Sequence, residues 1–194
     1  MTQVTREGDC YGSQMNDQPV VIGLQHGVGK RSAVNDRGAL RHEQIEGIVF
    51  RPARPVPHDH GFMFEVLRST WTEVTHDVPQ VHTTTTYPGR VRAWGLHRLG
   101  SDRLTVVSGI LSIVCFDGRT ASPTFGVVNE FRISDRNPGL LTIPPDVYHG
   151  WKNIGVADSV AVNMPTRLYD HDQPDSYDIE YESDLGREIV PWRW

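Results

Sequence analysis

The feature that most constrains the fold is a series of short hydrophobic segments between residues 91 and 155. No sustained 3.6-residue periodicity runs through them, and turn residues such as Gly109, Gly118 and Gly139 separate them. One strand and its turn occupy about ten residues, a spacing typical of a sandwich or barrel of β-strands. The pattern therefore predicts an all-β fold, with strands at residues 104–107, 110–116, 125–133 and 140–143.

Charge and hydropathy exclude some classes of partner. The chain has 194 residues, a net charge of −5 and no basic stripe, which argues against nucleic acid as a partner. No run approaches the roughly 18 consecutive apolar residues of a membrane helix, so no membrane partner is expected. The first residues lack the basic and then apolar pattern of a secretory signal. We therefore expect a cytoplasmic protein.

Composition divides the chain into two parts. Residues 1–45 are polar, and we interpret them as an N-terminal extension that is poorly ordered or forms an edge strand from the apolar residues 20–24. Residues 46–194 form the predicted β domain. His58 and His60 lie in a proline-rich segment without a clear third ligand, so we interpret them as solvated loop histidines rather than as a metal site.

Several short motifs stand in one order along residues 48–192. They are Gly61 with Phe62 and Glu65, then Gln80, Gly95-Leu96-His97, Ser122-Pro123-Thr124-Phe125-Gly126, Ile143-Pro144, His149-Gly150, and Thr166 with Tyr169. In this order they resemble the dTDP-4-dehydrorhamnose 3,5-epimerases, a cupin family. The resemblance implies a cupin jelly-roll β-barrel, usually a homodimer with exchanged strands, that works without a metal or another cofactor.

The resemblance also implies a reaction, the epimerisation of a small-molecule substrate, a dTDP-linked 4-keto-6-deoxy sugar. The family histidine that matches His97 is the base that removes the proton next to the ketone. The chemistry suits an imidazole, whose ordinary pKa of about 6.5 leaves much of it neutral at physiological pH. Proton abstraction beside a ketone also needs donors that stabilise the enolate oxygen.

Further site residues follow from the same resemblance. The family pairs its histidine with an aspartate near the carboxyl end, for which Asp184 or Glu182 is the candidate here. Arg103 stands in for a family lysine near the enolate and keeps the charge but not the shape. The residues expected around the substrate are Glu65, Gln80, His82, Trp94, Arg119, Tyr148, His149, Tyr169 and His60.

Three positions depart from the family pattern. Asn163 stands where the family has its acid tyrosine, and an amide cannot deliver a proton as a general acid. Tyr148, Tyr169 or a water would then supply the proton, or the enzyme would return it to the face it left. His60 and Trp94 stand where two family arginines hold the pyrophosphate. Trp94 could instead stack on a sugar or another flat ligand.

These observations leave three functions open. The first is an isomerase of the sugar-epimerase type with altered substrate or stereochemistry. The second is an enzyme on the same scaffold that acts on a different, non-nucleotide carbonyl compound in secondary metabolism, with His97 still the base. The third is a non-catalytic cupin that binds a sugar, an alternative motivated by Asn163.

Overall fold

The structure is a computed structural model that describes residues 43–71 and 77–194. Contacts divide the chain after Arg41, and all the described residues belong to the second unit, residues 42–194. The predicted edge strand at residues 20–24 and most of the predicted extension lie outside the described residues. No helix in the described ranges is long and apolar enough to cross a membrane.

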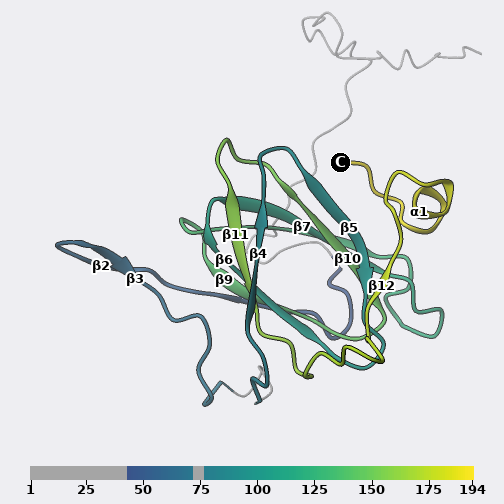
Figure 1. Cartoon of the computed structure of the whole chain (residues 1–194), viewed down its shortest axis with the longest axis horizontal. Helices are drawn as coiled ribbons and strands as arrows, with labels where there is room; N and C mark the ends of the chain where they lie inside the picture. Colours follow the sequence, from purple (N-terminus) through teal and green to yellow (C-terminus); the bar gives the residue numbers. More distant parts are fainter. Residues whose placement is uncertain (1–42, 72–76) are drawn as a thin grey trace, which may run out of the picture. The chain divides into compact units, whose positions relative to one another are not determined.

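Two five-stranded antiparallel sheets form the body of this unit (Figure 1). The first has the order β1 (Val49–Pro52), β9 (Gly139–Ile143), β6 (Asp102–Ser108), β11 (Ser159–Asn163) and β4 (His82–Thr86). The second has the order β12 (Tyr177–Asp178), β5 (Val91–Leu96), β10 (Val147–Asn153), β7 (Ile110–Asp117) and β8 (Val128–Ser134). Strands distant in sequence are neighbours in both sheets, as in a jelly roll, and the all-β prediction is confirmed.

The hydrophobic core lies between the two sheets. Buried side chains of β6 and β9, such as Val106 and Leu141, belong to one cluster with Ile113 of β7 and Val147 and Trp151 of β10. Side chains alternate between the two faces of a strand, so every second residue can face this core. The four predicted segments fall on β6, β7, β8 and β9, because their apolar residues are the ones that fill it.

Two glycines permit close approaches that shape the barrel. Gly109 turns the chain from β6 into β7 with φ +74°, and a Cβ there would come within 2.5 Å of the Ser159 hydroxyl. Gly150 lies in β10 at a close approach to the paired strand β5. A Cβ added at Gly150 would come within 2.3 Å of the Cβ of Ala93. The pairing register of β5 with β10 shifts between His149 and Trp151, so this close contact lies at an irregularity directly after His149.

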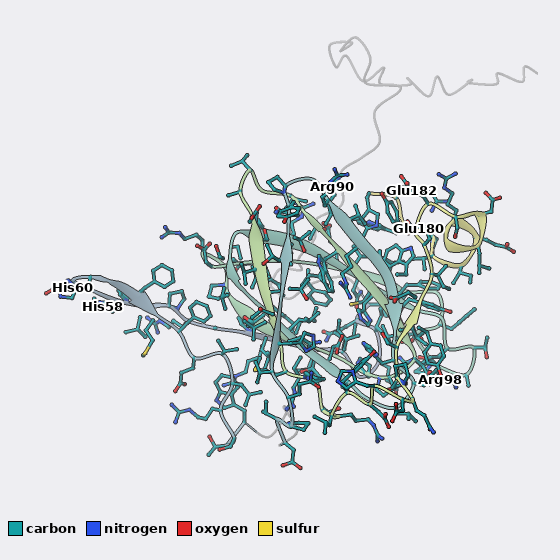
Figure 2. All side chains as sticks on the ribbon, in the orientation of Figure 1. His58, His60, Arg90, Arg98, Glu180 and Glu182 are labelled. Carbon is teal, nitrogen blue, oxygen red and sulfur yellow. The ribbon has the colours of Figure 1, made fainter. Side chains whose placement is uncertain are left out.

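A hairpin of β2 (Val56–His58) and β3 (Gly61–Met63) projects from the sheets, with His58 and His60 at its exposed tip (Figures 1 and 2). This position supports the interpretation of both residues as solvated. The hairpin tip does not line the cavity of this chain described below, so the expected contact of His60 with the substrate is not found within the chain.

The C-terminal segment packs against the second sheet. It carries α1 (Asp184–Ile189), whose N-cap Ser183 accepts a hydrogen bond from the Gly186 amide. Trp94 of β5 is 2% exposed and stacks on Trp194, with 5.5 Å between ring centroids. Trp94 is therefore a core residue, and the expectation that it stacks on a ligand is wrong.

Candidate active site

A cavity of about 840 Å³ opens between the sheets. Its walls come from β4, β5, β6, β10 and β11 and from the chain between residues 165 and 181. The residues predicted for the site that line this cavity are His97, Asn163, Gln80, His82, His149 and Tyr169. The predicted residues that do not line it are Asp184, Arg103, Glu65, Trp94, Arg119, Tyr148 and His60.

His97 directly follows β5 and is held in place by backbone contacts. Its carbonyl accepts a 2.7 Å hydrogen bond from the Asp146 amide. Its ring Nδ1 contacts the carbonyl oxygen of Asp175. The Asp175 carboxylate accepts the amides of the next three residues, Arg98, Leu99 and Gly100, at 2.8, 2.9 and 2.9 Å. Asp175 thus fixes both the imidazole and the turn that carries it.

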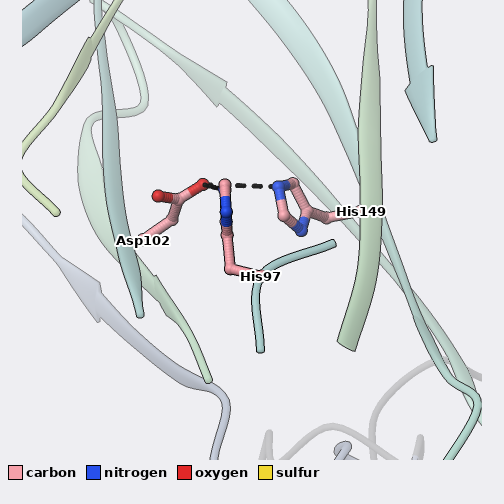
Figure 3. A group of neighbouring side chains, drawn as sticks. All are labelled: His97, Asp102 and His149. Carbon is pink, nitrogen blue, oxygen red and sulfur yellow. Dashed lines mark ion pairs between the residues drawn. The ribbon is translucent and has the colours of Figure 1, made fainter. Parts of the chain in front are cut away.

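Asp102 joins His97 and His149 into one cluster (Figure 3). The Nε2 atoms of both histidines lie 3.3 Å from the same Asp102 oxygen, Oδ2. The other oxygen, Oδ1, accepts a 2.8 Å hydrogen bond from the Asn163 amide nitrogen. Asp102 and His149 are buried, whereas 27% of the His97 side chain is exposed toward the cavity. The cluster therefore presents His97 to any bound molecule.

The charges in the cluster shift the pKa values of its members. The hydrogen bond to Asp102 raises the pKa of His97 from 6.5 to about 9, although burial acts in the opposite direction. Burial alone would raise the pKa of Asp102, but its hydrogen bonds to His149 and His97 outweigh it and hold that pKa well below the usual range. Both shifts favour an imidazolium beside a carboxylate.

The carboxylate paired with His97 is therefore Asp102, not Asp184 or Glu182. Asp184 begins α1 and is exposed, and Glu182 is exposed in the segment before it (Figure 2). Asp102 starts β6, and the antiparallel pairing of β6 with β9 and β11 brings its side chain into the barrel. Sequence order alone could not reveal this pairing, because it depends on strand register.

Arg103 is fully buried beside Asp102 but on the opposite face of β6. Its guanidinium donates to the carbonyl oxygens of Met164 at 2.6 Å and Pro165 at 3.2 Å, and also to that of Asp77. Neighbouring residues on a strand point to opposite faces. Arg103 therefore ties loops to the outside of the barrel and cannot reach an enolate in the cavity.

Three other predicted substrate contacts also have structural roles elsewhere. Arg119 forms an ion pair with buried Asp117 at 2.8 Å. Glu65 is exposed and pairs with Arg68. Tyr148 stacks on Phe116, with 6.3 Å between ring centroids. Of the tyrosines proposed to replace the acid, Tyr169 lines the cavity and Tyr148 does not.

Sequence reasoning missed several cavity residues. Asp102 and Asp175 were not singled out, nor were three arginines on the cavity wall, Arg90, Arg92 and Arg167. Arg90 and Arg92 flank the start of β5, the strand that leads to His97. Their closeness in sequence to the Gly95-Leu96-His97 motif is the signal that could have identified them. Within the described ranges, the group of His, Cys, Asp or Glu side chains close enough to share a metal ion is His97, Asp102 and His149.

Comparisons with known proteins agree with this architecture. The family model described as dTDP-4-dehydrorhamnose 3,5-epimerase matches residues 42–184. The chain belongs to this family. A relative from Haloferax volcanii, the probable low-salt glycan biosynthesis epimerase Agl13, is 38% identical over 139 residues, covering 71% of this chain and 89% of its own length.

Two further relatives extend the comparison. The spore coat polysaccharide biosynthesis protein SpsL of Bacillus subtilis is 28% identical over 150 residues, covering 77% of this chain and 96% of its own length. The dTDP sugar isomerase of Desulfovibrio desulfuricans superposes with a TM-score of 0.70 at 25% identity, covering 77% of this chain and 92% of its own. The epimerase family and its cupin fold, expected from the motifs, are thus confirmed.

Proposed function

We propose that this chain epimerises a nucleotide-linked 4-keto-6-deoxy sugar, with His97 removing the proton from a carbon next to the ketone. The observation that carries the proposal is the position of His97, partly exposed at the wall of the cavity with the Asp102 carboxylate against its Nε2. Membership of a dTDP-sugar epimerase family supports the substrate class.

The hydrogen bonds of His97 define which nitrogen acts. A carbonyl oxygen can only accept, so Nδ1 carries a hydrogen that it donates to Asp175. With the pKa of His97 raised to about 9, the neutral ring that acts as the base is the minority form near neutral pH, and it has its lone pair on Nε2, on the side of Asp102 and the cavity. When Nε2 takes the substrate proton, the imidazolium that forms lies 3.3 Å from the Asp102 carboxylate, which stabilises it. The family reaction class thus fits the geometry.

Asn163 positions Asp102, the carboxylate beside His97, rather than acting as an acid. Its amide holds Oδ1 of Asp102 at 2.8 Å, and its carbonyl oxygen accepts the Arg103 amide at 3.1 Å. Its place in the tyrosine position of the family remains an interpretation of the sequence. Tyr169, which lines the cavity, or a water is then the source of the returning proton.

The cavity arginines support a diphosphate in the substrate. The loss of arginines at positions 60 and 94 weakened this hypothesis, but Arg90, Arg92 and Arg167 line the cavity. Charge-assisted hydrogen bonds to phosphate contribute about 1.5–3 kcal/mol each in well-formed contacts. Homodimer assembly and a cytoplasmic location, both expected from the sequence, remain predictions.

The test is isotope exchange in deuterated water. Purified protein incubated with dTDP-4-keto-6-deoxyglucose is expected to incorporate deuterium at C3 or C5, as measured by mass spectrometry and NMR. Absence of exchange would reject the proposal for this substrate.

A second candidate, a non-nucleotide carbonyl substrate, is favoured by the acidic groups on the cavity wall. Asp178 and Glu180 line the same cavity as the arginines and would repel a diphosphate placed beside them. Calorimetric titration separates the two candidates. Binding of dTDP supports the nucleotide sugar, whereas no binding of dTDP supports the second candidate. Tight binding of the dTDP sugar without exchange would instead indicate the third possibility, a non-catalytic cupin.

A further inference from the structure

His82 lies on the cavity wall that the first sheet forms, whereas His97 lies on the wall that the second sheet forms. His82 begins β4, His97 directly follows β5, and both residues line the cavity between the sheets. We propose that His82 is the general acid that supplies the returning proton, on the face of the sugar ring opposite His97. This inference rests on the proposed function and adds to it the residue that decides the stereochemistry of the product.

The alternation of side chains along β4 directs His82 into the cavity. Thr86, at the other end of β4, is buried, and its hydroxyl oxygen accepts a 2.9 Å hydrogen bond from the indole nitrogen of Trp151 in the core. Every second side chain of a strand projects from the same face. His82 and Thr86 are four residues apart, so both project from the inner face of the sheet.

The pairing of β4 with β11 gives the same direction independently. His82 lies directly opposite Asn163 in this antiparallel pair. Residues in direct opposition project from the same face of a sheet and are close neighbours. The Asn163 side chain faces inward, because its amide donates to the Asp102 carboxylate beside His97. His82 is therefore the neighbour of the residue that holds the partner of the base.

Inversion at a carbon beside a ketone needs a base on one face and an acid on the other. Nε2 of His97 takes the proton, and the electron pair of the broken C–H bond forms the enolate, whose negative charge lies on oxygen. When the enolate returns to the ketone, the same carbon takes a proton from the His82 imidazolium on the opposite face. His97 keeps the first proton and His82 is left neutral, so both rings regain their starting state by proton exchange with water.

Few groups on the first sheet can supply this proton. Within the described ranges, the ionisable side chains that this sheet contributes to the cavity wall are His82 and Asp102. Although burial alone would raise the pKa of Asp102, its hydrogen bonds to His149 and His97 hold that pKa well below the usual range, so the carboxylate has no proton to give. Histidine is the side chain that most often acts as a general acid or base, and exposed His82 can regain its proton from water.

Tyr169 and a water are the other candidate donors. Tyr169 lies beyond the strands and is 46% exposed, and its ring packs edge-on against His171, with 5.0 Å between ring centroids. Its backbone amide donates at 2.9 Å to the side chain of Gln80, two residues before β4. A phenol is also a weaker acid than an imidazolium. These contacts suit a support for the start of β4 better than an acid.

The test separates proton removal from inversion. The full chain is incubated with dTDP-4-keto-6-deoxyglucose in deuterated water. Mass spectrometry measures deuterium incorporation, and NMR after borohydride reduction of the ketone measures the epimerised sugars. In His82→Asn, epimer formation should fall at least about 10²-fold, the lower end of a general-acid contribution. Deuterium should still enter the unepimerised sugar, because His97 can return a solvent-exchanged proton to the face it left. A merely structural role of His82 would not give this separation.

Thr83→Ala is the matched control, because Thr83 is the exposed neighbour of His82 whose side chain alternates to the outer face of β4. It should exchange and epimerise like the wild type. Tyr169→Phe should leave the ratio of epimer formation to deuterium exchange unchanged. Circular dichroism checks the fold of each variant, and His82→Gln repeats the test if His82→Asn does not fold.

The possible failures are distinguishable. Absence of exchange by the wild type rejects the proposed function and this inference with it. If the wild type exchanges, epimer formation at the wild-type rate by folded His82→Asn overturns this inference alone. Equal loss of exchange and of epimer formation in His82→Asn would assign His82 to substrate binding and also overturn it, as would wild-type exchange without any epimer.

Discussion

At the residue scale, Asp102 sets the protonation of His97. Asp102→Asn keeps the shape of the side chain but removes the charge that stabilises the imidazolium. We expect the pKa of His97, measured by NMR titration, to be about 9 in the wild type and to fall toward its ordinary 6.5 in the variant. Exchange measured above pH 9, where the imidazole is neutral in both proteins, should be slower in the variant because its imidazole is the weaker base. An unchanged His97 pKa would contradict the role given to Asp102.

The sequence identified candidate site residues where these residues belong to a short motif. His97 and His149 stand in short patterns of glycine and apolar residues, and both line the cavity. Asp102 could not be found in this way, because no local pattern distinguishes it from its neighbour Arg103. Which of the two faces the cavity depends on the register of β6, and a shift by one residue exchanges the two faces.

At the scale of elements, β5 and β10 approach each other closely at Gly150, next to His149. Gly150→Ala would place a Cβ 2.3 Å from the Cβ of Ala93 and 2.9 Å from the Arg92 carbonyl oxygen. We expect a loss of about 1–3 kcal/mol in unfolding free energy, measured by urea denaturation, together with reduced exchange activity. The double variant Ala93→Gly with Gly150→Ala should recover part of that stability. Unchanged unfolding free energy in Gly150→Ala alone would show that β5 and β10 can move apart there without loss of stability.

Strand positions were largely predictable, but strand partners were not. Short apolar segments with turn residues between them identified β6 to β9, because burial between two sheets requires that pattern. The segment between residues 165 and 181, which lines the cavity and includes Asp175, has little apolar character, and the sequence singled out Thr166 and Tyr169 in it but not Asp175. Its position depends on hydrogen bonds such as those from Asp175 to the turn after His97.

At the scale of the whole unit, buried Asp117 links the start of the described chain to the second sheet. Its carboxylate accepts from Arg119, Ser122 and Thr124 at 2.8, 2.6 and 2.6 Å, and the Thr124 hydroxyl oxygen accepts the Glu46 amide at 2.9 Å. Burial alone would raise the pKa of Asp117, but these hydrogen bonds outweigh it and hold the pKa below its usual value. A carboxylate with a lowered pKa stabilises the folded state above its unfolded pKa.

This stabilisation should therefore be lost as the pH falls below about 4. Asp117→Asn is expected to cost about 3 kcal/mol near neutral pH, because it leaves Arg119 without its partner, and to flatten the acid dependence of stability. Thermal unfolding measured between neutral pH and pH 3 checks both effects. Asp158→Asn, at an exposed aspartate, is the control and should behave like the wild type. Equal acid sensitivity in Asp117→Asn and the wild type would refute this assignment.

The most direct test of the proposed chemistry compares wild type, His97→Asn and His58→Asn in deuterated water with the dTDP-linked keto sugar. Because general-base catalysis contributes about 10²–10⁴-fold, His97→Asn should lose deuterium incorporation by at least that lower factor while keeping its affinity for the nucleotide. His58→Asn should exchange at the wild-type rate. Undiminished incorporation by a folded His97→Asn protein would contradict the account, because the proton would then leave through another group.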